Sequence, residues 1–244
     1  SPAEAGVVDW IESWARTHRI ETRRDEVLPG RCNLTLTLEN GAGPHFLLAG
    51  HTDTVAAAGM EFDPFGGAIT GGRLLGRGSA DMKGPLAAML GALLVLRGQR
   101  DLWRGRVSVA CVVDEEYQAR GIKALLARRR GGYDFAVVGE PTGMNVLRGC
   151  KGCLRFTFTA LGVAAHSSTP ELGRNAIVAM SEAVLALHTY FQTRLGSVRR
   201  PGFGCSTGSV GLVAGGTGIN IVPESCRASV DIRLLPGQRW EDTY

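Results

Sequence analysis

A histidine and several carboxylates stand at the ends of the apolar runs of this chain, where they could bind metal ions. They are His51, Asp53, Asp81, Glu115, Glu116 and Glu140. Acids gathered in one place repel one another unless a cation neutralises them, and imidazole with carboxylate suits Zn²⁺, or Co²⁺ and Mn²⁺ in its place. Two such ions about 3.5–4 Å apart, sharing Asp81 and a water molecule, would activate that water for hydrolysis. The residue types therefore make the chain an enzyme candidate.

Short apolar runs precede these polar residues and are expected to position them. Residues 45–50, 107–113 and 135–138 have the length and β-branched content of buried strands. In open α/β sheets the ligand crevice lies beyond the carboxyl ends of the strands. Residues that follow separate strands would therefore meet at one edge of the sheet.

Each of these signals has an ordinary alternative when it is taken alone. His51 and Asp53 are two residues apart and project to the same side, so Asp53 can bond one imidazole nitrogen while the other binds a metal; the alternative is a surface histidine in a turn. Asp81 could bridge two cations or cap the helix expected from Gly84. Their shared place in the expected topology favours the metal site.

The adjacent acids Glu115 and Glu116 have side chains that diverge, so one can bind a metal while the other acts as general base; the alternative is a solvated acidic turn. Glu140 precedes Pro141, which fixes the exit of the chain and fits either a held ligand or an ordinary turn.

Composition excludes several classes of protein. The 244 residues are 44% hydrophobic and 20% charged with a net charge of +4, which indicates a globular chain and argues against nucleic-acid binding. No apolar run approaches the roughly 20 residues that span a bilayer, and the N-terminus does not resemble a signal peptide. Six dispersed cysteines fit a reducing cytoplasm, and the lone Cys150–Cys153 pair is more often incidental than a metal or redox motif.

Two domains are expected from the order of the elements. Helices are expected near 7–17, 84–96, 121–129 and 175–192, and strands near 33–38, 46–49, 107–113, 134–138, 154–161, 209–213 and 226–234. Alternating strands and helices over residues 1–148 predict an α/β domain, with a mainly parallel sheet and helices on both faces. Residues 149–244 predict a smaller α+β domain.

Several motifs appear together and in order. They are Gly50-His51-Thr-Asp53-Thr-Val, Gly76-Arg-Gly-Ser-Ala-Asp81-Met-Lys-Gly84, Asp114-Glu115-Glu116, Gly139-Glu140-Pro-Thr142, Ala165-His166-Ser-Ser-x-Pro170, Gly173-Arg-Asn175, Asn220-Ile-Val-Pro223 and Asp231-Ile-Arg233. With these motifs the chain resembles the co-catalytic zinc hydrolases that include acetylornithine deacetylase, succinyl-diaminopimelate desuccinylase, aminoacylase and carboxypeptidase G. The resemblance implies a zinc-exopeptidase-like fold with a lid domain that dimerises.

The resemblance also implies roles for single residues. His51, Asp81 and Glu140 would bind one zinc, with Asp81 bridging to a second zinc held by Glu116. Glu115 would be the general base, Asp53 the partner that orients His51, and His166 a group that stabilises the oxyanion in the partner subunit. Asn220 and Arg233 match lid positions that hold a substrate carboxylate, and Glu140 in place of aspartate favours deacylases and carboxypeptidases over aminopeptidases.

The chain departs from this family in one respect. The second zinc of the family needs a late histidine, and the last one here, His188, falls inside the expected lid helix. We therefore expect a fragment of a longer protein that binds the second metal poorly and has little activity.

Of four alternatives to an N-acyl amino acid deacylase, two remain open and two are disfavoured by the sequence. A carboxypeptidase or dipeptidase of the same family and a non-catalytic relative that only dimerises both remain open. A serine nucleophile elbow at 204–208 lacks the strand before it and the helix after it. The glycines of 71–78 lack the ending of a phosphate loop and are more typical of a hairpin.

Overall fold

The computed structural model describes residues 4–128, 132–239 and 241. They form two compact units, Ser1–Asn145 (the N-terminal unit) and Val146–Tyr244 (the C-terminal unit). The helices are α1 (Glu4–Thr17), α2 (Gly84–Gly98), α3 (Arg120–Arg128) and α4 (Ala176–Thr193), with a short π-helix η1 (Ser79–Lys83) and 3₁₀ turns at Arg100–Leu102, Pro170–Leu172 and Leu195–Ser197. The long strands are β1 (Glu21–Leu28), β2 (Arg31–Asn40), β3 (His45–His51), β6 (Gly105–Val112), β7 (Phe135–Val138), β8 (Gly152–Leu161), β12 (Thr207–Gly215) and β14 (Ser225–Leu234).

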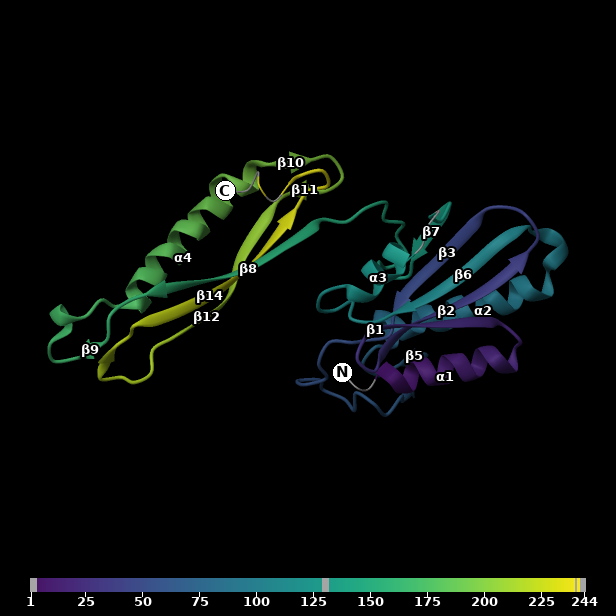
Figure 1. Cartoon of the computed structure of the whole chain (residues 1–244), viewed down its shortest axis with the longest axis horizontal. Helices are drawn as coiled ribbons and strands as arrows, with labels where there is room; N and C mark the ends of the chain where they lie inside the picture. Colours follow the sequence, from purple (N-terminus) through teal and green to yellow (C-terminus); the bar gives the residue numbers. More distant parts are fainter. Residues whose placement is uncertain (1–3, 129–131, 240, 242–244) are drawn as a thin grey trace. The chain divides into compact units, whose positions relative to one another are not determined.

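The sheet of the N-terminal unit has the strand order β1-β2-β6-β3-β7 (Figure 1). Strand β3 runs parallel to both β6 and β7, while β2 runs antiparallel to both β6 and β1. Four of the five strands therefore point in one direction and only β2 opposes them. The expected mainly parallel sheet is confirmed, and β3, β6 and β7 end at the same edge.

Helices cover both faces of this sheet, as expected. On one face α1 and α2 bury Ile11 and Leu93 against Leu36 and Val109. On the other face Leu125 of α3 packs into a smaller cluster with residues of β3 and β6. Because β6 contributes to both clusters, it is buried along most of its length, which explains its continuous run of apolar residues.

Two strands differ from the expectations. Strand β7 was expected to be buried, yet all four of its residues are exposed, with Phe135 and Val138 each 60% accessible. It is the last strand of the sheet, so among the described residues only β3 pairs with it. Strand β1 was not expected, because its sequence is mostly charged. It lies at the opposite edge, where charged residues keep an open strand from pairing with other chains.

The segment Ser79–Gly98 is long and apolar enough to cross a membrane by length and composition, although no apolar run of that length was expected from the sequence. In this unit its inner face packs on the sheet: Leu86, Met89, Leu90 and Leu93 belong to the main core. A core helix passes the same test, so the segment gives weak evidence for a membrane span.

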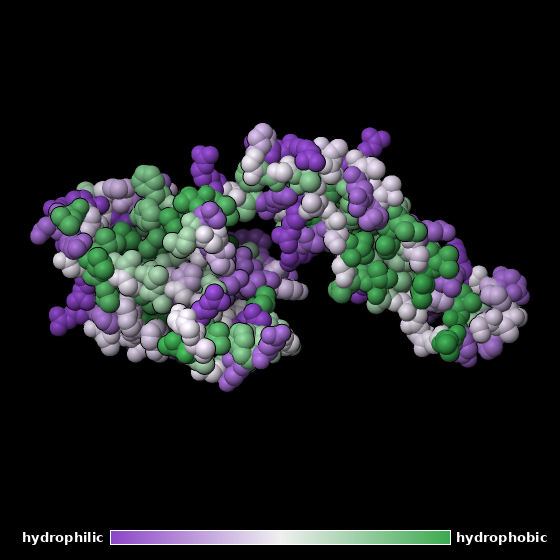
Figure 2. All heavy atoms as spheres, turned by 180° about the vertical axis from the view of Figure 1, so that it is seen from behind, coloured by the Kyte–Doolittle hydropathy of each residue, from purple (hydrophilic) through white to green (hydrophobic). Residues whose placement is uncertain are grey.

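The C-terminal unit is an antiparallel sheet of order β12-β14-β8 with helix α4 packed on it (Figure 1). Phe191 of α4 lies over Val230 and Ile232, and Met180 lies near Cys226 and Ala228. Asn175 caps α4 by accepting from the backbone N–H groups of Ile177 and Val178. Two-residue strands complete the unit as the pairs β9 (Ala165–His166) with β13 (Ile221–Val222) and β10 (Arg199–Arg200) with β11 (Gly204–Cys205). Figure 2 shows hydrophobic side chains gathered on the surface of this unit.

The structure shows what the glycines of 71–78 and the serine motif at 204–208 form. Residues 69–74 form the hairpin of β4 (Ile69–Thr70) and β5 (Arg73–Leu74), with Gly71 and Gly72 at positive φ in the turn, as expected. A two-residue strand, β11, precedes Ser206 against the expectation, and β12 follows it where the motif needs a helix; Ser206 is fully buried and its hydroxyl donates to Gln238 Oε1, so it is no exposed nucleophile. Helix α3 ends at Arg128, and Arg129, included in the expected helix, lies outside the described residues.

Candidate metal centre

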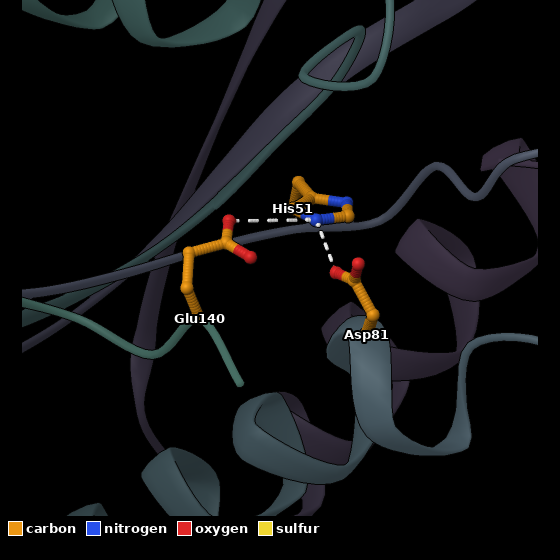
Figure 3. Close-up of side chains that lie close together, drawn as sticks. All are labelled: His51, Asp81 and Glu140. Atoms are coloured by element: carbon orange, nitrogen blue, oxygen red, sulfur yellow. Dashed lines mark hydrogen bonds and ion pairs between the residues drawn. The ribbon is translucent and has the colours of Figure 1, made fainter. Parts of the chain in front are cut away.

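His51 ends β3 and faces two carboxylates that come from other segments (Figure 3). Its Nε2 atom lies 3.0 Å from Asp81 Oδ1 and 3.6 Å from Glu140 Oε1. Within the part of the chain that the structure describes, these three residues form the one group of metal-ligand side chains whose donor atoms lie within 4.8 Å of one another. The structure thus joins the three residues expected to bind the first metal.

Two glycines let the segment around Asp81 approach the strand ends. A Cβ atom at Gly50 would lie 2.6 Å from Met82 Cε, and one at Gly139 would lie 2.4 Å from Met89 Cε. Each glycine directly precedes a predicted ligand, His51 or Glu140. In both cases the nearest atom is the terminal methyl group of a methionine side chain, so an added side chain would first displace these methyl groups, and the glycines allow α2 and the preceding turn to pack closely on the strand ends.

Asp81 belongs to an irregular turn and does not cap the helix. It lies inside η1 with extended backbone angles, and Gly78 begins this turn at a φ of 85°. The N-cap position of α2 is Lys83, and no side chain bonds to the backbone there. The alternative of a capping role for Asp81 is therefore wrong, and its carboxylate, 48% exposed, faces His51 instead.

Asp53 ties His51 to the loop that carries the two adjacent glutamates. Nδ1 of His51 donates to the backbone oxygen of Asp53 at 2.9 Å, with the Asp53 carboxylate at 3.5 Å. That carboxylate also accepts from the backbone N–H groups of Glu115 and Glu116, both at 3.1 Å. With Nδ1 used as a donor, Nε2 is the nitrogen that faces Asp81 and Glu140, the arrangement that a metal-binding imidazole requires.

The acids around His51 make its positive form unusually stable. Burial acts to lower the pKa of His51, but its hydrogen bonds to Asp53 and the charges of Glu140 and Asp53 outweigh burial and raise the pKa to about 9. Burial alone would raise the pKa of Asp53, but hydrogen bonds from His51 and from the amides of Glu115 and Glu116 lower it. The pocket therefore favours a cation beside Nε2.

The pKa values of two other carboxylates near His51 are raised, unlike the pKa of Asp53. Burial, and then the charge of Asp81, raise the pKa of Glu116, although His51 opposes them. For Glu140 burial again comes first and raises the pKa, His51 lowers it, and the charges of Asp81, Glu115 and Glu116 raise it. Carboxylates that repel one another across a small space bind protons more readily, and a divalent cation would relieve the same repulsion.

The donor set fits a zinc ion. Zn²⁺ binds histidine nitrogen and carboxylate oxygen at about 2.0–2.2 Å, so the ligand atoms of a tetrahedral site lie about 3.3–3.6 Å apart. The two distances from His51 Nε2, 3.0 and 3.6 Å, bracket this spacing. One imidazole and two carboxylates leave a position for a water or a substrate, as catalytic zinc sites do.

Among the residues predicted for the lid, His166 and Asn220 are neighbours. His166 pairs with Ile221 in the β9–β13 ladder, and the backbone of Ser167 donates to the Asn220 oxygen at 3.0 Å. Nδ1 of His166 lies 2.8 Å from the Ser168 hydroxyl and 3.2 Å from the Ser168 backbone nitrogen, so local contacts orient the ring. His166 is exposed.

Arg233 lies far from Asn220 within the same unit. Asn220 comes before the first residue of β14, and Arg233 is the ninth residue of that ten-residue strand, about 26 Å along it at 3.3 Å per residue. Arg233 Nε instead lies 2.7 Å from Asp231 Oδ1, and Arg155 Nε lies 2.8 Å from Asp231 Oδ2. One copy of this unit therefore does not bring Asn220 and Arg233 to one small carboxylate.

The other three histidines lie outside the group of His51, Asp81 and Glu140. His18 Nδ1 bonds the Trp14 oxygen at 2.8 Å, and His45 Nε2 lies 2.8 Å from the Ser108 hydroxyl. His188 lies in α4 and lines a hollow of about 670 Å³ in the C-terminal unit. All six cysteines are free, and Cys150 and Cys153 are both exposed.

Sequence reasoning missed the residues that hold the loop after β6. Asp114 is 1% exposed and lies 3.2 Å from Arg31 Nη1. Asn33 in β2 accepts from the Val113 N–H and donates to the Gly121 oxygen. In the sequence only the position of Asp114, directly before Glu115 and Glu116, pointed to this loop, and no separate role was predicted for it.

A mainly parallel sheet with a histidine–carboxylate group at its strand ends is the arrangement that the sequence resemblance leads one to expect of a metallohydrolase. Residues 47–232 match the pattern of peptidase family M20/M25/M40, which is more than half of the chain. The chain belongs to this family, whose members act on amide and peptide bonds.

Curated relatives support the same family. An acetylornithine deacetylase from Proteus mirabilis (strain HI4320) is 33% identical over 246 residues, covering 97% of this chain and 62% of that protein. A succinyl-diaminopimelate desuccinylase from Rhodospirillum centenum (strain ATCC 51521 / SW) is also 33% identical, covering 96% of this chain and 64% of that protein. The chain thus spans less than two thirds of the length of these relatives.

Solved structures share the fold. Aminopeptidase PepT from Bacillus cereus superposes with a TM-score of 0.70 at 23% identity, over 100% of this chain and 64% of that one. A dinuclear metal-binding peptidase of the M20 family from Bacillus subtilis gives a TM-score of 0.63 at 15% identity, over 98% and 60%. The fold class expected from the sequence is confirmed.

Proposed function

We propose that this chain carries the catalytic machinery for metal-dependent hydrolysis of the amide bond of an N-acyl amino acid. The observation that supports this most is the convergence of Asp81 and Glu140 on Nε2 of buried His51. The ~30% identity to deacetylases and a desuccinylase supports an acyl amide as the bond that is cleaved. A cytoplasmic location remains part of the proposal.

The residues would divide the work between metal binding and proton transfer. His51, Asp81 and Glu140 would hold one zinc, Asp81 and Glu116 a second, and Co²⁺ could replace either. The bound ions would supply an activated water and polarise the acyl carbonyl. Glu115 is exposed beside these ligands and would take a proton from the attacking water and return it to the leaving amine.

The C-terminal unit would serve as the lid and the dimerisation domain. Its His166 would donate from Nε2 to the oxyanion of the partner subunit, and Asn220 and Arg233 would hold the substrate carboxylate. Because Asn220 precedes β14 and Arg233 lies near the C-terminal end of that strand, the two residues would act on different copies of the site. Exposed apolar side chains on α4 and β12 favour a homodimer through this unit; they are Val178, Leu185, Leu212 and Val213.

The first experiment measures zinc and hydrolysis on the same sample. The purified chain is reconstituted with zinc, its zinc content is determined by elemental mass spectrometry, and release of free amine is followed from acetylornithine, succinyl-diaminopimelate and a dipeptide. We expect about one tightly held zinc per chain, because no histidine besides His51 is assigned to the two ions, and slow hydrolysis of the acyl substrates that a chelator stops.

The variant Glu115→Gln tests the assignment of the general base. Loss of proton transfer should lower the hydrolysis rate by about 10²–10⁴-fold while zinc content stays unchanged. Loss of zinc in this variant would mean that the wrong glutamate was assigned as base. Hydrolysis that survives both the chelator and the substitution would contradict the proposed function, and two tightly held zinc ions would reveal a ligand not identified above.

A further inference from the structure

We propose that Asp114, clamped by Arg31, is a positioning residue that sets the loop carrying Glu115 and Glu116. The inference rests on the proposed function for the roles of the two glutamates. It concerns buried charges that the proposed chemistry does not use: Asp114 is 1% exposed and Glu4 is 3% exposed.

A chain of ion pairs leads from helix α1 to this loop. Arg31, the first residue of β2, reaches Glu4 of α1 with two nitrogens, Nε and Nη2, the latter at 2.8 Å from Oε1. Its third nitrogen, Nη1, lies 3.2 Å from Asp114 Oδ1. One guanidinium thus uses its whole fork to join two buried carboxylates, a geometry that lysine cannot reproduce.

Asp114 is held from the other side as well. Arg120, the first residue of α3, places Nε 2.9 Å from Asp114 Oδ2, which is an ion pair by distance but not a directed hydrogen bond. The backbone N–H of Arg120 donates to the same oxygen at 3.4 Å. The Asp114 carboxylate therefore closes the loop between β6 and α3 at both ends.

The backbone of Asp114 shows why the loop needs this support. Its φ is 63°, in the left-handed region, which aspartate tolerates at an energetic cost and most other residues avoid. The next two residues turn their N–H groups toward the Asp53 carboxylate. A left-handed residue at this point redirects the chain after β6, so that the amides of Glu115 and Glu116 meet Asp53 and their side chains lie beside the metal site.

General stabilisation is the competing explanation, and it accounts less well for these contacts. A buried ion pair is often no more stable than an apolar pair of the same volume, because removing both charges from water costs several kcal/mol. Four charged groups here, Glu4, Arg31, Asp114 and Arg120, meet next to the two glutamates and not in the middle of the core. Their arrangement instead fixes one conformation of the loop.

Hydrogen exchange of the metal-free chain tests the proposal without relying on hydrolysis. In Arg31→Lys the charge stays but the fork is lost, so we expect exchange of the amides of residues 115–116 to rise by at least about tenfold while exchange across β6 is unchanged. Zinc affinity should fall by about 10–100-fold, the effect of losing support behind metal ligands. The matched control is Arg24→Lys, because Arg24 joins β1 to Asp9 and Glu12 of α1 in a similar manner, away from the loop.

The outcomes separate the proposals. Exchange at 115–116 that is unchanged in a folded Arg31→Lys variant, or that rises equally across β6, overturns the positioning role. If Arg31→Lys does not fold, Arg120→Lys, at a half-exposed position, and Asp114→Asn, which tolerates the left-handed backbone, must show the local rise in exchange instead. A local rise in exchange in Arg31→Lys, together with no hydrolysis by the zinc-loaded unsubstituted chain, would support the positioning role and contradict the proposed function.

Discussion

The two histidines singled out from the sequence lie in very different surroundings. His51 is 2% exposed, and both of its ring nitrogens face acidic residues, Asp53 on one side and Asp81 with Glu140 on the other. His166 is exposed on a two-residue strand, and its Nδ1 accepts from Ser168 in the next turn. One ring is fixed by packing and charge, whereas the other is oriented only by local hydrogen bonds.

This difference is the one expected between residues that bind an ion and residues that act only when a partner subunit is present. A metal site needs ligands held in place before binding, because ordering them afterwards costs affinity. The N-terminal unit meets that condition through the burial of His51 and the hydrogen bonds that Asp53 accepts. Arg233 and Asn220 in the C-terminal unit, by contrast, are exposed, and most of the length of β14 separates them.

The largest effect is expected from replacing the two histidines in turn. His51→Ala removes the only nitrogen of the metal group, so zinc affinity should fall by more than the roughly 100-fold that follows loss of a supporting residue. His166→Ala should leave zinc affinity unchanged, because this ring lies in the other unit. Competition for zinc with a chromophoric chelator measures both variants.

The circular dichroism of the metal-free proteins serves as the control for folding. Equal losses of zinc in the two folded variants would contradict the contrast between the histidines. An unchanged zinc affinity in His51→Ala would remove the basis of the proposed metal site altogether.

A smaller effect is expected at two aspartates that each receive several hydrogen bonds. In Asp53→Asn the side chain can accept from only one of the two glutamate amides, so zinc affinity should fall by about 10–100-fold. Asp231→Asn is the matched control, since Asp231 pairs with Arg155 and Arg233 in the C-terminal unit. Zinc titration measures the affinity of both variants. A loss of zinc affinity in Asp231→Asn would mean that the C-terminal unit also affects metal binding, which would contradict the contrast.

Much of the N-terminal unit could be predicted from the sequence. The runs that became β3 and β6 are β-branched and continuous because both faces of these strands are buried, and that pattern is legible without a structure. The rule that ligands gather beyond the ends of parallel strands then predicts that His51 and Glu140 lie close together.

Other features depend on neighbours that a sequence does not reveal. Phe135 to Val138 has the same composition as a buried strand, so nothing in it shows that β7 is exposed at the edge. Strand β1 carries almost no apolar pattern, because ion pairs such as Arg24 with Asp9 join it to α1. The role of Asp114 depends on a left-handed backbone and on Arg31, 83 residues earlier in the chain.

The pKa of His51 provides a further test of the contrast between His51 and His166, because its effect varies with pH. Its pKa of about 9 in the folded chain lies above its ordinary 6.5, so protonation stabilises the metal-free fold fully below pH 6.5 and this contribution is lost as pH rises through 9. The free energy of unfolding, measured with urea, should therefore decrease between pH 6.5 and 9. The decrease should disappear in His51→Ala and persist in His166→Ala.

Zinc must replace the same proton, so its affinity should rise by up to about tenfold per pH unit below pH 9 and level off above it. Calorimetry in two buffers of different ionisation enthalpy would count the proton released. A zinc affinity independent of pH over this range would contradict the protonated state of His51.

The smallest effect is expected at Arg233, and it would show whether the exposed residues of the C-terminal unit bind substrate. Its ion pair with Asp231 is about half exposed, so Arg233→Lys should change the free energy of unfolding by less than about 1 kcal/mol and leave zinc affinity unchanged. The lysine cannot bind a carboxylate with two parallel hydrogen bonds, so KM for an acyl amino acid should rise while kcat changes little. Arg227→Lys, on the same strand, is the control, and an equal rise of KM in both variants would assign the effect to net charge and not to Arg233.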